Sequence, residues 1–420
     1  MELIPRPIGG RITAIPSKSQ AHRLLICAAL ADHTTKLVCP QRSKDIEATA
    51  ACLEGLGAKC CYVSGAYHIT PIHRADAADI DCGESGSTLR FLLPIVAALG
   101  IDTTFHLHGR LPERPLSPLW EELEAHGCTL SRPTADTIHC TGKLLGGTFR
   151  IAGNISSQFI SGLLFALPLI GTDSDIMLTS AIESGSYIRM TLTALHSFSI
   201  ATERTAAGWH IPSGQHYHAT AVHSIPEAQL SVEGDWSNAA FWLCAGAISQ
   251  PVTVTGLDPD SAQGDRAVLD ILRRFGAGVL WENGSVTVSP KPLRATQIDA
   301  SDIPDLVPPL ALVASCAEGK THIYGAARLR IKESDRLQSV TDTLNSLGGQ
   351  AEILPDGLLI HGRQLTGGSV DACNDHRIAM LAAIASAVCT QSVQLSGAEA
   401  VSKSYPRFWE DFYTMQKEDL

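Results

Sequence analysis

Two short patterns recur along the whole 420-residue chain and divide it into six similar units. In the first pattern, a helical stretch is followed by Gly and then by two strand-like runs. Glycine after a helix supplies a left-handed C-terminal cap, and apolar runs around Asn-Gly or Asp-Gly predict hairpins. The anchor positions stand roughly 70–77 residues apart, at Gly57, Gly127, Ser199, Gly276 and Gly348. Such a period predicts a chain built from copies of one supersecondary unit.

Six apolar helices form the second pattern, and each opens with polar residues that can cap it. The equivalent positions are Ser19, Ser87, Ser157, Ser237, Asp305 and Asp375. Because these helices are apolar almost all round, we expect them to be buried. The helices that precede the Gly anchors are amphipathic, and we expect them to lie on the outside. Each unit then reads as strand, buried helix, strand, outer helix and hairpin. The longest step contains the extra segment 213–229, where we place a boundary between two halves of three units.

Composition excludes several classes of protein. With 45% hydrophobic and 18% charged residues, the chain is not disordered, a coiled coil or a collagen. A net charge of -11 disfavours nucleic acids and anionic membranes as partners. The 12 cysteines never form C-x-x-C, and residues 1–16 contain no hydrophobic run typical of a signal peptide. We therefore expect a reduced, cytoplasmic protein whose cysteines are small buried core residues.

Lysines and arginines gather at the starts of the expected helices. A helix N-terminus carries unpaired N–H groups and a partial positive charge, so it favours anions. Each residue alone has an ordinary explanation as a helix cap or a surface ion pair. Their recurrence in an acidic chain instead predicts a phosphate- or carboxylate-rich small molecule held between two similar domains.

Two other kinds of site find little support. The chain has no G-x-x-x-x-G-K-[ST] motif and no G-x-G-x-x-G motif after a strand, so the usual nucleotide-binding loops are absent. The tract HYHATAVH at 216–223 could suggest a metal site, but no carboxylate-rich shell accompanies it in the sequence. We expect no metal and no cofactor.

Nine blocks of sequence, in one order, resemble the 5-enolpyruvylshikimate-3-phosphate synthase family of enolpyruvyl transferases. They cover residues 16–412 and include IPSKSQAHRLL, CGESGSTLRFL, GRLPERPL, ISSQFISGLL, GDWSNAAFW, IPDLVPPLAL, RIKESDRL, NDHRIAM and SKSYPRFWEDF. The resemblance implies an α/β (α+β) fold of two inside-out α/β barrel domains, with six βαβαββ repeats, three per domain. It further implies that the N-terminal strand joins the second half. The expected domains are then 18–230 and 1–17 with 231–420, with the active site in the cleft between them.

By the same resemblance, the protein transfers the enolpyruvyl group of phosphoenolpyruvate to the 5-hydroxyl of shikimate 3-phosphate and releases phosphate, in chorismate and aromatic amino acid biosynthesis. The residues implied for shikimate 3-phosphate are Lys18, Ser19, Arg23, Ser156, Ser157, Gln158, Ser184, Tyr187, Asp305 and Lys332. Those implied for phosphoenolpyruvate are Lys18, Gly86, Arg110, Gln158, Arg336, Arg377 and Lys403.

The reaction implied by the resemblance needs a base for the hydroxyl proton and an acid for the methylene carbon. Asp305 is our expected base and Glu333 our expected proton shuttle, with Lys18 as a third catalytic residue. We expect a monomer. The cations would repel one another across an empty cleft, so we expect shikimate 3-phosphate to shift the protein from an open to a closed state.

Some positions depart from the family pattern, and two rival functions remain. The departures are Glu84, Arg189, Trp236 and Arg328, of which Arg328 could alter contacts to the shikimate phosphate. Gly86 marks the place where a side chain would crowd the inhibitor glyphosate, which suggests sensitivity. One rival is the related transferase acting on UDP-N-acetylglucosamine, although GRLPERPLSP lacks that family's reactive Cys. The other rival is a non-catalytic anion-binding relative.

Overall fold

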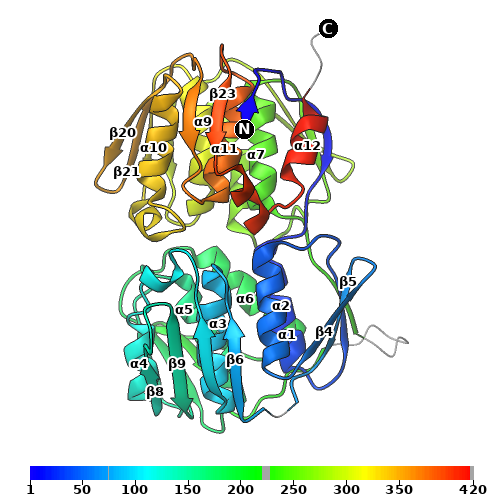
Figure 1. Ribbon diagram of the computed structural model, residues 1–420, viewed down its shortest axis with the longest axis vertical. Helices are drawn as coiled ribbons and strands as arrows, with labels where there is room; N and C mark the ends of the chain where they lie inside the picture. Colours follow the sequence, from blue (N-terminus) through cyan, green and yellow to red (C-terminus); the bar gives the residue numbers. More distant parts are fainter. Residues whose placement is uncertain (74, 220–227, 417–420) are drawn as a thin grey trace. The chain divides into compact units, whose positions relative to one another are not determined.

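A computed structural model describes residues 1–73, 75–219 and 228–416 of the chain. It divides into two compact units, which we call the central unit, Pro16–Val232, and the terminal unit, Met1–Ile15 with Glu233–Leu420. Both ends of the chain thus belong to the terminal unit (Figure 1). These limits lie close to the domain limits that the sequence suggests.

Three four-stranded sheets surround the helices of the central unit. Their strand orders are β14-β3-β5-β4, β6-β7-β9-β8 and β10-β11-β13-β12. In each sheet the first pair is parallel and the others are antiparallel. The strands are β3 (Thr35–Val38), β4 (Lys59–Val63), β5 (Ala66–Thr70), β6 (Ala77–Asp81), β7 (Asp102–His106), β8 (Cys128–Ser131), β9 (Thr137–Gly142), β10 (Thr148–Ile151), β11 (Ser174–Leu178), β12 (Glu203–Arg204), β13 (Gly208–Ile211) and β14 (Ala228–Ser231).

Helices of the central unit alternate between an inner and an outer position. The inner ones carry mostly buried residues and lack a polar face, as the sequence predicts. They are α1 (Lys18–Leu30), α3 (Gly86–Leu99) and α5 (Ser157–Ala166). The outer helices, which bury one face only, are α2 (Lys44–Gly55), α4 (Leu119–Ala125) and α6 (Gly185–Ser197).

The terminal unit repeats this plan with one difference. Its sheets are β16-β17-β15-β2, β18-β19-β21-β20 and the three-stranded β1-β23-β22. The strands are β1 (Glu2–Leu3), β2 (Gly10–Thr13), β15 (Val252–Thr255), β16 (Gly278–Glu282), β17 (Ser285–Ser289), β18 (Gln297–Asp299), β19 (Lys320–Tyr324), β20 (Gln350–Leu354), β21 (Gly357–His361), β22 (Gly368–Asp371) and β23 (Val393–Ser396). The inner helices are α7 (Trp236–Ile248), α9 (Val307–Cys316) and α11 (His376–Ser386), and the outer ones are α8 (Val268–Phe275), α10 (Arg336–Ser346) and α12 (Phe408–Met415).

The difference lies in the sixth repeat. The repeat pattern places its next Gly anchor at residue 420, so any hairpin after the last outer helix lies outside the described residues. Strand β1, from the start of the chain, pairs antiparallel with β23 and takes a place in that sheet.

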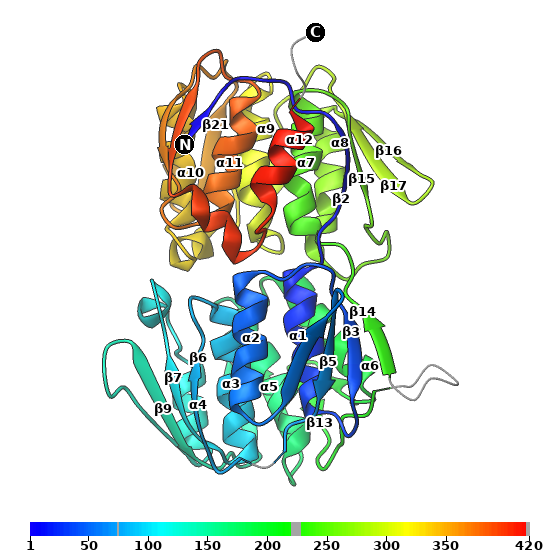
Figure 2. The same ribbon diagram turned by 45° about the vertical axis from the view of Figure 1, so that its right-hand side comes forward.

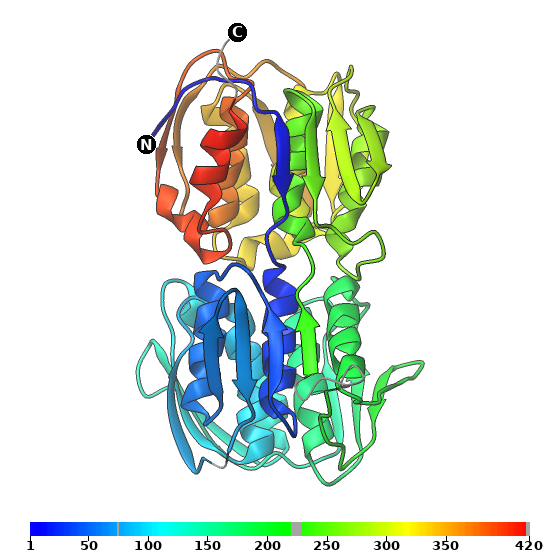
Figure 3. The same cartoon turned by 90° about the vertical axis from the view of Figure 1, so that its right-hand side faces the viewer.

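The chain passes between the two units twice, once after β2 and once after β14. β2 precedes α1 in the chain, yet it pairs in parallel with β15 of the terminal unit. β14 precedes α7, yet it pairs in parallel with β3 of the central unit (Figure 2). In Figure 3 the blue β2 accordingly lies with the green strands of the terminal unit. The implied return of the N-terminal strand to the second half is therefore observed.

Backbone conformation confirms the first repeat pattern. All four anchor glycines, Gly57, Gly127, Gly276 and Gly348, have φ between 85° and 104°. Ser199, which replaces glycine at the fifth anchor, has φ 61° and thus the same left-handed conformation. The expected helix ends are therefore present in all five copies.

The cysteines and the helix lengths bear on two further expectations. All cysteines are free, and all but Cys61, Cys316 and Cys373 are buried. The expectation of buried core cysteines is wrong for Cys61 and Cys373, which are exposed. In the described parts of the chain, none of the helices is both long and apolar enough to cross a membrane.

Candidate functional site

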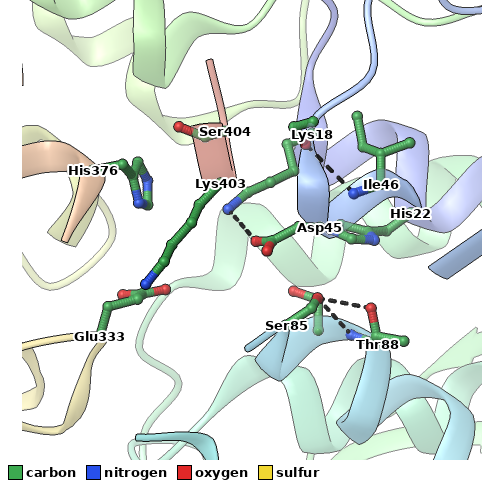
Figure 4. A network of polar contacts seen from close by, with 12 residues as sticks. Lys18, His22, Asp45, Ile46, Ser85, Thr88, Glu333, His376, Lys403 and Ser404 are labelled. Atoms are coloured by element: carbon green, nitrogen blue, oxygen red, sulfur yellow. Dashed lines mark hydrogen bonds and ion pairs between the residues drawn. The ribbon is translucent and has the colours of Figure 1, made fainter. Parts of the chain in front are cut away.

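The N-terminus of α1 carries a charged pair in the central unit. Ser17 caps the helix by accepting from the backbone N–H of Gln20. Lys18, the first helical residue, places its Nζ 2.8 Å from Oδ2 of Asp45 on α2 (Figure 4). Both side chains are partly exposed, at 17% and 15%, so an incoming anion can reach the ammonium group. Asp45 was missed in the sequence, where it appears only as an acidic residue in the first turn of an outer helix.

Arg23 is fixed one turn further along α1. Its Nε donates to Oγ1 of Thr191 at 2.9 Å, and its Nη2 donates to the carbonyl of Tyr187 at 2.9 Å. Burial lowers the pKa of Arg23 to about 10, so the group remains charged at neutral pH. These bonds hold the start of α1 against α6, the helix that carries Tyr187.

A chain of hydrogen bonds runs from His22 of α1 through Thr49 of α2 to the start of α3. Nδ1 of His22 lies 2.7 Å from Oγ1 of Thr49, which lies 2.6 Å from Oγ1 of Thr88. Thr88 in turn donates to Oγ of Ser85, the N-cap of α3, at 2.7 Å (Figure 4). Burial, followed by the charges of Lys18 and Arg23, lowers the pKa of His22 well below its usual value. His22 is therefore neutral, and it positions the helix starts without adding charge.

The starts of α3 and α5 meet through Gln158. Its Nε2 donates to Oγ of Ser87 at 2.9 Å, and its Oε1 accepts from Nη1 of Arg90 at 3.3 Å. Gly86 lies beside this contact, because a Cβ there would stand 2.6 Å from Nη1 of Arg90 and 2.8 Å from Nη1 of Arg114. The absence of a side chain at Gly86 therefore leaves room for two guanidinium groups.

The remaining expected residues of the central unit also lie at helix starts. Ser156 caps α5 by accepting from the N–H of Gln158, and Ser157 is the first residue of that helix. Ser184 is the N-cap of α6 and has φ 55°, a left-handed conformation that is uncommon for serine. Arg110 is more exposed, and its Nε lies 3.6 Å from Glu113. The neighbouring Gly109 packs against Glu84, one of the residues that differ from the family pattern.

In the terminal unit, three carboxylates surround the guanidinium of Arg336. Nε donates to Oδ2 of Asp375 at 2.7 Å, Nη1 to Oδ1 of Asp305 at 2.8 Å, and Nη2 to Oε2 of Glu333 at 2.7 Å. Arg336 is 1% exposed and Asp375 is fully buried, whereas the side chains of Asp305 and Glu333 are 17% and 22% exposed. The two expected acid–base residues are thus held by one cation and remain partly accessible.

Electrostatics keep Arg336 and Asp375 ionised. Burial acts to lower the pKa of Arg336, but Asp375, Glu333 and Asp305 outweigh it and raise the pKa above its usual value. Burial acts to raise the pKa of Asp375, but Arg336 lowers it below the usual value. Asp375, which also caps α11, was not among the expected site residues; its signal in the sequence is only that of a helix cap.

Two further cations border the cluster. Nη2 of Arg377 lies 3.0 Å from Oδ2 of Asp305. Nζ of Lys403 donates to the carbonyl of Asn374 at 2.6 Å, and its side chain points toward Glu333 (Figure 4). Burial lowers the pKa of Lys332 to about 8, although Asp305 and Glu333 act to raise it. Asp305 and Glu333 therefore contact Arg336 directly, and Arg377 reaches the same cluster through Asp305.

Asp265 is a buried carboxylate that sequence reasoning missed. It accepts a short hydrogen bond from Oγ of Ser237. Burial and the nearby charge of Asp305 raise its pKa to about 7, while Arg377 acts to lower it. Nothing in the local sequence QGDR distinguishes this aspartate, because its burial results from tertiary packing.

Two of the residues that differ from the family pattern, Arg328 and Trp236, have clear contacts. Nη2 of Arg328 donates to the carbonyl of Ser301 at 2.8 Å. Trp236 is fully buried, donates through Nε1 to the carbonyl of Asp258 at 3.2 Å, and stacks on Trp281. The bulky residue at 236 is therefore accommodated in the core of the terminal unit.

The chemistry of each unit follows from these contacts. The central unit offers helix N-termini, hydroxyl groups and the cations Lys18, Arg23 and Arg90, which suit phosphate and carboxylate groups. The terminal unit offers carboxylates that can exchange protons, bordered by lysine and arginine.

Comparisons with known proteins match the whole chain. The family described as EPSP synthase (3-phosphoshikimate 1-carboxyvinyltransferase) matches residues 4–412. The chain is 40% identical over 415 residues to the 3-phosphoshikimate 1-carboxyvinyltransferase of Clostridium kluyveri, covering 98% of this chain and 96% of that protein. A protein of the same name from Clostridioides difficile is 38% identical over 428 residues, with the same coverage of 98% and 96%.

Solved structures show the same fold. An EPSP synthase from Acinetobacter baumannii superposes with a TM-score of 0.82 at 24% identity, covering 99% of this chain and 98% of that one. The enolpyruvyl transferase NikO from Streptomyces tendae superposes with a TM-score of 0.76 at 19% identity, covering 99% and 96%. The two-domain inside-out α/β fold expected from the sequence is therefore confirmed.

Proposed function

The chain belongs to the EPSP synthase family, and from this membership we propose that it transfers the enolpyruvyl group of phosphoenolpyruvate to the 5-hydroxyl of shikimate 3-phosphate. The products are 5-enolpyruvylshikimate 3-phosphate and phosphate, in the biosynthesis of aromatic amino acids. Within the structure, the observation that carries the proposal is the Arg336 cluster. There, two partly exposed carboxylates lie beside cations that suit an acidic substrate.

In the central unit, the helix starts are proposed to hold the anionic groups of the substrates. Shikimate 3-phosphate would contact Lys18, Ser19, Arg23, Ser156, Ser157, Gln158, Ser184 and Tyr187. Phosphoenolpyruvate would contact Lys18, Gly86, Arg110 and Gln158. The hydrogen bonds that join Arg23 to Tyr187 and Gln158 to Ser87 support this assignment, because they fix these groups before a ligand arrives.

In the terminal unit, Lys332 is proposed to contact shikimate 3-phosphate, and Arg336, Arg377 and Lys403 to contact phosphoenolpyruvate. Arg336 is already occupied by three carboxylates and is almost fully buried. A substrate carboxylate would therefore replace Asp305 or Glu333 on this guanidinium. That exchange would release a carboxylate for proton transfer when the substrate binds.

The proposed reaction proceeds by addition and elimination. Asp305 takes the proton of the 5-hydroxyl as its oxygen bonds to C2 of phosphoenolpyruvate, and Glu333, which must be in its protonated form in the substrate complex, gives that proton to C3. The resulting tetrahedral adduct carries a methyl group. In elimination, Glu333 takes back a methyl proton, the bond from C2 to the phosphate oxygen breaks, and Asp305 returns its proton to the leaving phosphate. Positioned acid–base groups of this kind typically contribute about 10²–10⁴-fold each.

The test is release of phosphate from phosphoenolpyruvate, with shikimate 3-phosphate or UDP-N-acetylglucosamine as acceptor. We expect release with shikimate 3-phosphate only, abolished in Lys18→Ala and reduced at least about 100-fold in Asp305→Ala. Lys44→Ala, which removes an exposed lysine at the start of α2, is the matched control and should retain full activity. Release with the nucleotide sugar alone, or with neither acceptor, would refute the proposal.

We also propose that the active form is a monomer. Every residue assigned a role above comes from one chain, so the reaction needs no contribution from a second copy. Light scattering across the concentration range used for activity should give the mass of one chain, 44.7 kDa. A dimer mass throughout that range would contradict the proposal.

A further inference from the structure

Two histidines and one aspartate meet on the surface of the central unit. Asp32 and His33 follow the end of α1, and His218 lies after β13. Oδ1 of Asp32 is 2.5 Å from Nδ1 of His33, and Oδ2 of Asp32 is 2.8 Å from Nδ1 of His218. The imidazole rings lie edge to face with centroids 5.0 Å apart. One carboxylate thus joins two imidazoles from distant parts of the chain.

The backbone fixes this arrangement. Ala31 and Tyr217 form a parallel bridge, and the N–H of Asp32 donates to the carbonyl of Tyr217 at 3.1 Å. The N–H of His218 donates to the carbonyl of Phe198 at 2.9 Å. The buried hydroxyl of Tyr217 donates to the carbonyl of Phe165 at 2.7 Å, inside the core. The residues that carry the three side chains are therefore anchored on both sides of the cluster.

Other histidines pair with aspartates, but the described residues contain no second cluster of this composition. His210 contacts Asp175 at 2.9 Å and Asp173 at 4.0 Å without a second imidazole. In the Asp32 cluster, one ligand atom from each residue lies within 4.8 Å of the others. Although HYHATAVH offers no carboxylate in sequence, the fold supplies Asp32 to His218. Residues 220–223 of that tract lie outside the described residues.

We propose that Asp32, His33 and His218 bind one divalent transition-metal ion of the zinc type. Two imidazole nitrogens and one carboxylate oxygen are common zinc ligands, at about 2.0–2.2 Å, and leave a fourth position for water. Tetrahedral ligands at that range stand roughly 3.3 Å apart, so small side-chain rotations would open the present contacts to admit the ion. Each neutral imidazole would bind through Nδ1 and carry its single proton on Nε2.

The accessibility and charge of the cluster suit an ion arriving from solvent. The side chains of Asp32, His33 and His218 are 50%, 32% and 55% exposed. The carboxylate of Asp32, which lies between the two imidazoles, supplies a negative charge for the cation.

The position of the cluster separates it from the proposed catalytic residues. Lys18 begins α1, whereas Asp32 follows its end, and a helix of 13 residues is roughly 20 Å long. The ion would join the end of α1 to the segment after β13. Its expected effect is to stabilise the folded central unit, since a ligand that binds only the folded state raises the unfolding temperature.

The first experiment uses the full chain after removal of metal with a chelator. We expect titration with Zn²⁺ to saturate at one equivalent and to raise the unfolding temperature. Titration with Co²⁺ should give the visible absorption of a tetrahedral N/O site without a thiolate charge-transfer band. A thiolate band would place the ion on an exposed cysteine such as Cys61 or Cys373 and overturn the proposal, as would the absence of binding.

Three variants locate the site. Asp32→Asn, His33→Asn and His218→Asn should each weaken Zn²⁺ binding at least about 100-fold, because loss of even an outer partner typically costs 10–100-fold. His210→Asn removes a histidine from a comparable aspartate pair and should leave the affinity unchanged. Activity with shikimate 3-phosphate checks that each variant is folded, because none of these residues has a proposed catalytic role. Unchanged affinity in Asp32→Asn and His218→Asn would refute the assignment.

Discussion

Arg336 and Asp375 share two hydrogen bonds in the interior of the terminal unit, from Nε to Oδ2 at 2.7 Å and from Nη2 to Oδ1 at 3.3 Å. The guanidinium plane is thereby fixed on one side, and its other edge faces Asp305 and Glu333. Asp375 thus sets the orientation of the cation that holds the two carboxylates proposed to be catalytic.

Asp375→Asn should destabilise the protein and reduce its activity. Breaking a buried ion pair typically costs about 3–5 kcal/mol, and because Asp305 and Glu333 remain to balance Arg336, we expect about 2–3 kcal/mol. Urea unfolding, followed by the fluorescence of the buried Trp236 and Trp242, measures this change.

The matched control for that variant is Glu410→Gln, which removes an exposed ion pair with Arg407. It should alter the free energy of unfolding by less than about 1 kcal/mol. Equal effects of the two variants would show that the Arg336–Asp375 pair has no special role.

Gly86→Ala should impair the binding of phosphoenolpyruvate more than that of shikimate 3-phosphate. The added Cβ would stand 2.6 Å from Nη1 of Arg90 and 2.8 Å from Nη1 of Arg114, so at least one guanidinium must shift. Steady-state kinetics should show the KM for phosphoenolpyruvate raised at least about tenfold, the equivalent of 1.4 kcal/mol. Gly171→Ala, where a Cβ would meet nothing within 4 Å, serves as the control. A larger effect on the KM for shikimate 3-phosphate would contradict the assignment of Gly86.

The sequence predicts the repeat because its signals are local. The left-handed conformation after each outer helix requires glycine or a tolerant residue, and Ser199 could be recognised by its place in the period. The burial of α3 and α5 follows from their nearly uniform apolar composition. The return of the N-terminal strand to the second half was implied by the family resemblance alone, because the pairing of β1 with β23 joins residues from distant parts of the chain.

The sequence motifs predicted which residues belong to the site, but not how those residues contact one another. Arg336, Asp305 and Glu333 were recognised from their sequence blocks, but their contact depends on how the segment before inner helix α9 meets the start of outer helix α10. The pairing of Lys18 with Asp45 and of Asp32 with His218 likewise arises from packing, which no local spacing rule describes.

The affinity for shikimate 3-phosphate should decline at alkaline pH. Burial lowers the pKa of Lys332 to about 8, so the ammonium is charged below that pH and loses its proton above it. If the charged form holds the substrate phosphate, kcat/KM for shikimate 3-phosphate should fall up to about tenfold per pH unit above pH 8. In Lys332→Arg the decline should move to higher pH, because a guanidinium stays protonated. A wild-type profile that stays level to pH 10 would exclude this role for Lys332.

Asp265→Asn should stabilise the protein at neutral pH. The folded-state pKa of about 7 lies above the ordinary aspartate pKa of 3.8, so between these values the folded state binds more protons than the unfolded state. Stability contributed by this group is therefore present at low pH and is lost as the pH rises toward 7. Each pKa unit corresponds to about 1.4 kcal/mol, so the variant should gain a few kcal/mol at pH 7.5 and little at pH 4.

The asparagine at 265 can still accept the hydrogen bond from Ser237, so the variant isolates the effect of charge. Asp270→Asn removes an exposed aspartate from α8 of the same unit and should leave the pH dependence of unfolding unchanged. Urea unfolding of the three proteins at pH 4, 6 and 7.5 measures the difference. If Asp265→Asn were less stable than the wild type at pH 7.5, Asp265 would be a stabilising anion, and the proposed cost of burying its charge would be wrong.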